Sequence, residues 1–106
     1  MAKLNCFVIM PFRRDFDPVF DAVQRSVQHA VPGEEIRCHW LKDLQAAGRI
    51  TDDIITSLRD SDLCITDVTA LNPNVMWETG YAMALGKPTI LIGQKLEELP
   101  FDRVLA

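Results

Sequence analysis

Short runs of strand length alternate along the chain with stretches of helical periodicity, and this alternation limits the fold more than any other feature. The strand-like runs cover residues 6–10, 35–40, 63–66 and 87–92. One helical pattern opens at Asp17-Pro18, a cap followed by a first-turn proline, and ends at Pro32-Gly33. A second follows Gly48, and a third runs from Asn72 to Gly86. Such alternation favours parallel strands joined by right-handed crossovers, with helices on both faces of the sheet.

The strands themselves support a parallel sheet. The runs at 6–10, 63–66 and 87–92 are apolar throughout, which is typical of parallel strands covered on both faces. The run at 35–40 alternates polar and apolar residues, so we expect it near a sheet edge. We therefore expect one α/β domain over residues 1–106, with a flavodoxin-like open parallel sheet of four or five strands. A Rossmann-like strand order is the alternative, and residues 101–106 fit either a fifth strand or a last turn.

The third helix carries the most unusual residue. Asn72 is expected as its N-cap, and Gly86 as the residue just past its end. An apolar stripe of this helix, with spacings of three, four and three residues, is interrupted by one carboxylate; its members are Val75, Glu78, Ala82 and Leu85. Taken alone, Glu78 is compatible with a boundary residue whose carboxylate reaches water.

Polar residues follow each of the predicted strands. Because open α/β sheets bind ligands outside the carboxyl ends of their strands, we expect these residues to meet at one rim. In strand order they are Pro11, Phe12, Arg13 and Arg14, then Asp43 and Gly48, then Asp67, Thr69, Asn72 and Asn74, and finally Gly93 and Gln94. This convergence favours a functional reading of Glu78 over that of a surface glutamate.

Several of these residues have more than one interpretation. Arg13 and Arg14 fit a solvated loop pair or a phosphate site, since guanidinium groups match phosphate oxygens. Asp67 ends a buried strand, where it would cap the next turn or orient a sugar hydroxyl. Asp43 is most simply a loop aspartate.

Common nucleotide and hydrolase motifs are absent from the sequence. There is no GxGxxG, no GxxxxGK[ST] and no GxSxG, so dinucleotide-binding Rossmann, phosphate-loop and serine-hydrolase sites are not supported. The remaining candidate is a glutamate accompanied by further acids and amides. Such groups perform chemistry at glycosidic bonds. Neither histidine has metal-ligand spacing, and no cofactor or metal is expected.

The motifs that remain resemble one known family. Residues 7–12 (FVIMPF), 61–69 and 72–88 (NPNVMWETGYAMALGKP) are similar to the nucleoside 2-deoxyribosyltransferase-like family, which is related in fold to Toll/interleukin-1 receptor (TIR) domains. The resemblance covers nearly the whole chain, and residues 72–88 are its most specific part. It implies a flavodoxin-like sheet, and it implies that Glu78 attacks C1′ of a ribosyl or deoxyribosyl group and releases the base.

The resemblance leaves several activities open. Related nucleotide N-glycosidases hydrolyse the bond and bind a 5′-phosphate, for which Arg13, Arg14 and the N-terminus of the third helix would serve. TIR-like relatives cleave NAD with a corresponding glutamate, and a non-catalytic nucleotide-binding or assembly module is a third alternative. Two departures weigh against base exchange: Asn72 replaces an acid of the classical transferases, and Phe12 replaces a tyrosine. Family members also continue beyond Phe101 into a last strand and helix, so the chain resembles an excised domain or a minimal member.

Composition limits the partners. The net charge of −4 makes duplex nucleic acid an unexpected partner, and no apolar run is long enough to span a membrane. The three cysteines lie inside apolar runs without CxxC spacing, which indicates buried thiols in a reducing cytoplasm. We therefore expect a cytoplasmic homo-oligomer that binds a nucleoside, a nucleotide or NAD.

Overall fold

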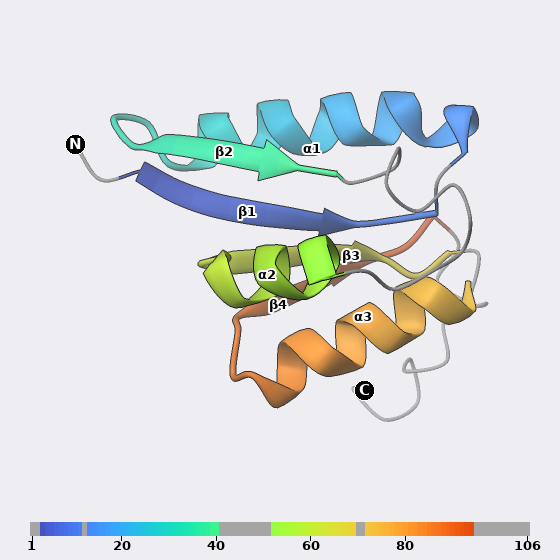
Figure 1. The fold of residues 1–106 in the computed structure, drawn as a ribbon. Helices are drawn as coiled ribbons and strands as arrows, with labels where there is room; N and C mark the ends of the chain where they lie inside the picture. Colours follow the sequence, from blue (N-terminus) through green and yellow to red (C-terminus); the bar gives the residue numbers. More distant parts are fainter. Residues whose placement is uncertain (1–2, 12, 41–51, 70–71, 95–106) are drawn as a thin grey trace, which may run out of the picture.

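In the computed structural model, residues 3–11, 13–40, 52–69 and 72–94 are described, and they form a parallel sheet with helices on both faces (Figure 1). Its strands are β1 (Lys3–Ile9), β2 (Glu35–His39), β3 (Leu63–Asp67) and β4 (Thr89–Ile92). They lie in the order β2-β1-β3-β4, and every neighbouring pair is parallel. A Rossmann-like sheet would place β2 between β1 and β3, so the predicted flavodoxin-like α/β fold is confirmed. The expectation for residues 101–106 falls outside the described residues.

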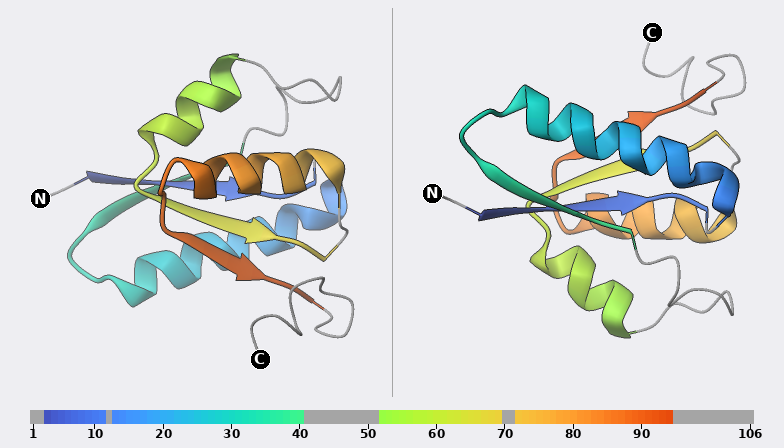
Figure 2. Two further views of the ribbon diagram at one scale, coloured as in Figure 1. Left: turned by 90° about the horizontal axis from the view of Figure 1, so that it is seen from below. Right: turned by 90° about the horizontal axis from the view of Figure 1, so that it is seen from above.

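The helices divide between the two faces of the sheet. Helix α1 (Asp17–Ala30) covers one face, and α2 (Asp52–Asp60) and α3 (Pro73–Ala84) cover the other (Figure 2). A single 3-10 turn, η1 (Arg14–Phe16), leads into α1, and its Phe16 amide donates to the carbonyl of Arg13 at 3.0 Å. Because of this turn, Phe16 and not Asp17 is the N-cap of α1, and the prediction that Asp17 caps the helix is wrong.

Two apolar cores lie on opposite sides of β1 and β3. Alternate side chains of β1 enter different cores, as the two-residue period of a strand requires. One core packs beneath α2 and α3 and contains Phe7, Ile9, Ile54, Leu58, Cys64, Val75 and Ala82. The other packs beneath α1 and contains Cys6, Val8, Met10, Phe16, Val23 and Ile65. The continuous apolar sequence of β1 is thereby explained, since both of its faces are covered.

The two outer strands of the described sheet are less covered. Strand β2 alternates exposed and half-buried residues, which confirms its predicted edge position. Strand β4 differs from prediction, because Ile90 is 49% exposed although residues 90–92 are all apolar. Helix α1 leaves an apolar groove of about 290 Å³ beside this strand, lined in part by Val23, Ile65, Ile90 and Ile92. Within the described ranges, no helix is both long and apolar enough to cross a membrane.

Helix α3 begins and ends almost as its sequence predicts. Asn72 is the N-cap, Pro73 lies in the first turn, and Gly86 follows the helix with a φ of +75°. That left-handed conformation is readily adopted by glycine, which has no Cβ. Val75, Glu78 and Ala82 of the predicted stripe are buried, whereas Leu85 is 40% exposed. Leu85 is the C-cap, so the stripe ends one turn earlier than predicted.

Candidate functional site at the carboxyl ends of β1 and β3

The position of the candidate site follows from the strand order. The chain leaves β1 toward β2 on one side, whereas β3 lies on the other side of β1. In flavodoxin-like sheets, ligands bind where neighbouring strands diverge in this way, outside their carboxyl ends. The segments after β1 and β3 and the N-terminus of α3 lie at this end of the sheet (Figure 1).

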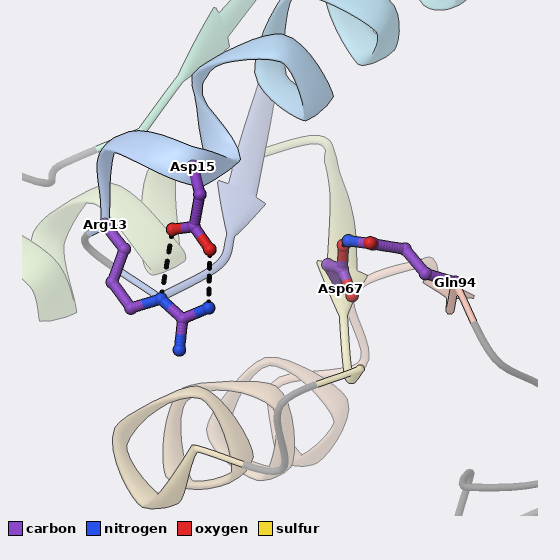
Figure 3. Close-up of polar contacts among 4 residues, drawn as sticks. All are labelled: Arg13, Asp15, Asp67 and Gln94. Carbon is purple, nitrogen blue, oxygen red and sulfur yellow. Dashed lines mark hydrogen bonds and ion pairs between the residues drawn. The ribbon is translucent and has the colours of Figure 1, made fainter.

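Asp67 is the last residue of β3 and is 1% exposed. Its Oδ1 accepts a hydrogen bond from the Thr69 amide at 2.9 Å. Its Oδ2 accepts one from the Gln94 side-chain amide at 3.2 Å (Figure 3). The backbone amide of Gln94 in turn donates to Thr69 Oγ1 at 2.8 Å. Asp67 therefore caps the turn after β3, as one of its two interpretations predicts, and joins this turn to the residues after β4. A role for Asp67 at a sugar hydroxyl stays a prediction.

Arg13 follows β1 and pairs with a nearby acid. Its Nε and Nη2 atoms donate to the two carboxylate oxygens of Asp15 at 3.0 and 2.6 Å (Figure 3). The Arg13 guanidinium also lies 5.2 Å from the centre of the Phe16 ring. Hydrogen bonding to Arg13 lowers the pKa of the Asp15 carboxyl below its usual value. Arg13 and Asp15 are 59% and 61% exposed, so solvent screens the pair and its contribution to stability is small.

Asn72 occupies the N-terminus of α3. Its side-chain oxygen accepts hydrogen bonds from the amides of Asn74, at 2.9 Å, and Val75, at 3.3 Å. These amides are two of the four that a helix N-terminus leaves without a partner inside the helix. The side chain of Asn74 is partly exposed on the first turn.

Glu78 lies on the inner face of α3 and is 2% exposed. The interpretation that its carboxylate reaches freely into solvent is therefore wrong. Its neighbour Thr79 lies 3.2 Å from the hydroxyl of Thr66, the residue before Asp67. This contact holds the second turn of α3 against the carboxyl end of β3. Because side chains on a helix lean toward its N-terminus, Glu78 leans toward the same end of the sheet as Asp67 and Arg13.

The other predicted site residues have mixed outcomes. Pro11 is buried at the end of β1, while Arg14 is exposed within η1. Phe12, Asp43 and Gly48 lie outside the described residues, so their predicted places in the site stay predictions. Within the described part of the chain, no group of three or more histidine, cysteine or acidic residues is arranged to hold a metal ion.

Three contacting residues were not among the sequence-based candidates. Asp15 could have been found, because an acid two residues after an arginine is a common partner for it. Thr66 and Thr79 had no such signal, since they are 13 positions apart and meet only when α3 packs on β3. Thr79 also hydrogen-bonds to the Val75 carbonyl at 2.6 Å, an interaction that is local to the helix.

The sheet order and this rim of polar residues define a flavodoxin-like α/β protein with a candidate site at its strand switch point. No protein-family model matches the chain, and comparison with curated proteins gave no match. Among solved structures, the chain is similar to a 2-deoxyribosyltransferase from Leishmania mexicana, with a TM-score of 0.59 and 18% sequence identity over 87% of this chain. The chain spans 65% of the length of that protein. At this level of identity the likeness establishes the fold, and activity must be argued from the site.

Proposed function

We propose that this domain cleaves or transfers the N-glycosidic bond of a nucleoside or nucleotide, with Glu78 as the nucleophile. The observation that carries the proposal is the burial of this carboxylate on the apolar inner face of α3, next to Thr79, which contacts Thr66 of β3. Burying a carboxylate carries a desolvation cost, and a buried carboxylate on a helix that starts at the ligand-binding end of an open α/β sheet is a candidate for a chemical role. The shared fold with a 2-deoxyribosyltransferase supports the same reading.

The reaction would proceed in two displacements. A carboxylate oxygen of Glu78 forms a bond to C1′ as the bond from C1′ to the base nitrogen breaks, and the base leaves with the electron pair and takes a proton from water. Water or a second base then attacks C1′, the bond from C1′ to Glu78 breaks, and the attacking group gives up a proton to solvent, which yields hydrolysis or transfer. Two carboxylates facing one sugar are the usual equipment for this chemistry.

Asp67 is the second residue that we assign to catalysis. It keeps acceptor capacity beyond its hydrogen bonds from Thr69 and Gln94, and it would orient a sugar hydroxyl. The further residues that we assign to substrate binding are Pro11, Phe12, Arg13, Arg14, Asp43, Gly48, Asn72 and Asn74.

The contacts that Asn72 and Arg13 already make favour a nucleoside over a nucleotide as the substrate. The two α3 amides that would meet a 5′-phosphate already donate to Asn72, and the Arg13 guanidinium already binds Asp15 in bidentate fashion. A phosphate would have to displace these internal acceptors, and among the described residues just after β1 only Arg14 adds a second positive charge to bind it. We therefore expect faster base release from a 2′-deoxynucleoside than from its 5′-monophosphate.

The test is release of free base, followed by chromatography, from nucleosides, nucleoside monophosphates and NAD. Glu78→Gln preserves side-chain size and removes the nucleophile, so base release should fall by at least about a thousandfold. Glu35→Gln, an exposed carboxylate at the opposite end of the sheet, is the matched control and should keep full activity. Full activity in folded Glu78→Gln protein would refute the assignment of Glu78.

The same set of substrates distinguishes the two other predicted functions from this one. Release of nicotinamide from NAD would favour the TIR-like alternative, on which none of the comparisons bears. Tight nucleotide binding without base release from any substrate would favour the non-catalytic module.

A further inference from the structure

Two of the three cysteines meet between β1 and β2, which run side by side (Figure 1). Cys6 of β1 and Cys38 of β2 are direct partners in the parallel register of the two strands. Residues paired in this way point to the same face of a sheet, and here that face is the one beneath α1. The two side chains hydrogen-bond to each other. The sheet therefore holds two thiols in contact, outside the candidate site.

The two thiols differ in their access to solvent. Cys6 is 0% exposed, whereas Cys38 is half-buried on the edge strand β2. The third cysteine, Cys64 of β3, is also 0% exposed, and it lies in the core on the opposite face of the sheet, where its sulfur is 3.4 Å from the Ser61 hydroxyl. A small reagent can thus reach Cys38 from solvent, and Cys6 can react through Cys38, while Cys64 is separated from both by the sheet.

We propose that Cys6 and Cys38 form a reversible disulfide when the chain is exposed to a peroxide. Neighbouring strands lie about 4.8 Å apart, which is within the Cα separation of about 4.4–6.8 Å that a disulfide accepts. The Cβ atoms of a disulfide lie about 3.8 Å apart, so closing the bond draws β2 toward β1 at this point. Strand β2 can make this movement, because among the described strands it pairs with β1 alone. The resulting strain makes the bond easier to reduce.

The oxidation takes two steps. The Cys38 sulfur, as thiolate, attacks one oxygen of hydrogen peroxide, so that a sulfur–oxygen bond forms and the oxygen–oxygen bond breaks. The leaving hydroxide takes up the proton lost by Cys38, which yields a sulfenic acid and water. The Cys6 sulfur then attacks the Cys38 sulfur, the sulfur–oxygen bond breaks, and the leaving hydroxide takes the Cys6 proton to give a second water. The two thiols lose two electrons, and the peroxide gains them.

The surroundings favour a disulfide over further oxidation of Cys38. The core beneath α1 contains Cys6 and packs against Cys38, and its other members are apolar. A disulfide is uncharged, whereas the sulfinic acid that further oxidation forms would bring a charge against this core. Burial raises the pKa of both thiols, so both are protonated near neutral pH, the dithiol is the resting state and oxidation should be slow. The proposal does not depend on the proposed function, because neither cysteine belongs to the candidate site.

The test exposes the folded full chain to hydrogen peroxide, alkylates the remaining thiols and locates disulfides by peptide mass spectrometry. The wild type should lose two of its three free thiols together, in a peptide that links Cys6 to Cys38, and dithiothreitol should restore all three. Cys38→Ser should form no disulfide within the chain. Cys64→Ala is the matched control and should form the same disulfide as the wild type, because Cys64 lies on the other face of the sheet.

A linked Cys6–Cys38 peptide that is present in Cys64→Ala, absent in Cys38→Ser and removed by dithiothreitol supports the proposal. Circular dichroism before and after oxidation establishes that each chain is folded, and the wild-type peptide map decides the matter if a variant is not. Oxidation that stops at an acid of Cys38 with the Cys6 thiol intact overturns the proposal. So does a disulfide that contains Cys64 or joins two chains, or three thiols that persist under peroxide sufficient to oxidise free cysteine completely.

Discussion

Replacing Asn72 by alanine removes the side-chain oxygen that caps helix α3. Two amides lose their acceptor, that of Asn74 at 2.9 Å and that of Val75 at 3.3 Å. Asn72 is partly exposed, so water can replace the lost acceptor and the cost is that of an ordinary cap, about 1 kcal/mol. For a domain of this size, that loss lowers the melting temperature by about 4–8 °C.

Replacing Asn72 by aspartate keeps an acceptor for the cap and adds a negative charge. The carboxylate keeps an acceptor in the same place, and its charge interacts favourably with the helix dipole by about 0.3–1 kcal/mol. We therefore expect Asn72→Asp to be as stable as the wild type or slightly more stable. This variant also restores the acid that the resembled transferases carry at this position, so its base release should be measured beside its stability.

The assay is urea unfolding followed by circular dichroism. With an m-value of about 1–2 kcal/mol/M, Asn72→Ala should lower the midpoint by about 0.5–1 M without changing the slope. Gln24→Ala, at an exposed position on α1, is the control and should stay within about 0.5 kcal/mol of the wild type. If Asn72→Ala unfolds at the wild-type midpoint, or if Asn72→Asp is less stable than Asn72→Ala, the cap does not stabilise α3 and the reasoning fails.

Two further predictions concern buried polar groups. Thr79→Val leaves the buried Thr66 hydroxyl without its partner and should lower the free energy of unfolding by about 1–3 kcal/mol, measured in urea. The double variant Thr66→Val, Thr79→Val should recover most of that loss. A double variant that recovers none of it would contradict the pairing. Burial raises the pKa of the Cys6 thiol from 9.0 to about 12, so this thiol should lower the free energy of unfolding by up to about 1.4 kcal/mol per pH unit between pH 9 and 12. Burial also raises the pKa values of Cys38 and Cys64, which add to this fall. Urea midpoints from pH 8 to 10.5 test this, and Cys6→Ala should reduce the slope.

The fold could be predicted because its signals are local and repeated. Asn72-Pro73 and Gly86 mark the limits of α3, and the continuous apolar run at residues 6–10 requires a strand that is covered on both faces. Strand alternation then leaves few topologies. The prediction for β4 failed at Ile90, because an apolar run indicates a strand but does not tell which helix covers it.

The candidate site could be predicted only in outline. Its location depends on strand order, which the alternation of elements narrows to a few alternatives. The contact of Thr66 with Thr79 depends on how α3 packs on β3 in three dimensions. The bidentate pair of Arg13 with Asp15 is instead local in sequence, so Asp15 could have been proposed as a partner when Arg13 was predicted as a candidate for phosphate.

The way α3 is attached to the sheet has a consequence for how substitutions could change the candidate site. Asp67 ends β3, so the backbone ladders that pair β3 with β1 and β4 fix its position. Glu78 is carried instead by a helix that rests on side chains, among them Val75 and Ala82. A change of one methyl group in that layer can move Glu78 relative to the strand ends while the ladder stays intact. Substitutions far from the rim can therefore shift Glu78, a candidate nucleophile, relative to Asp67.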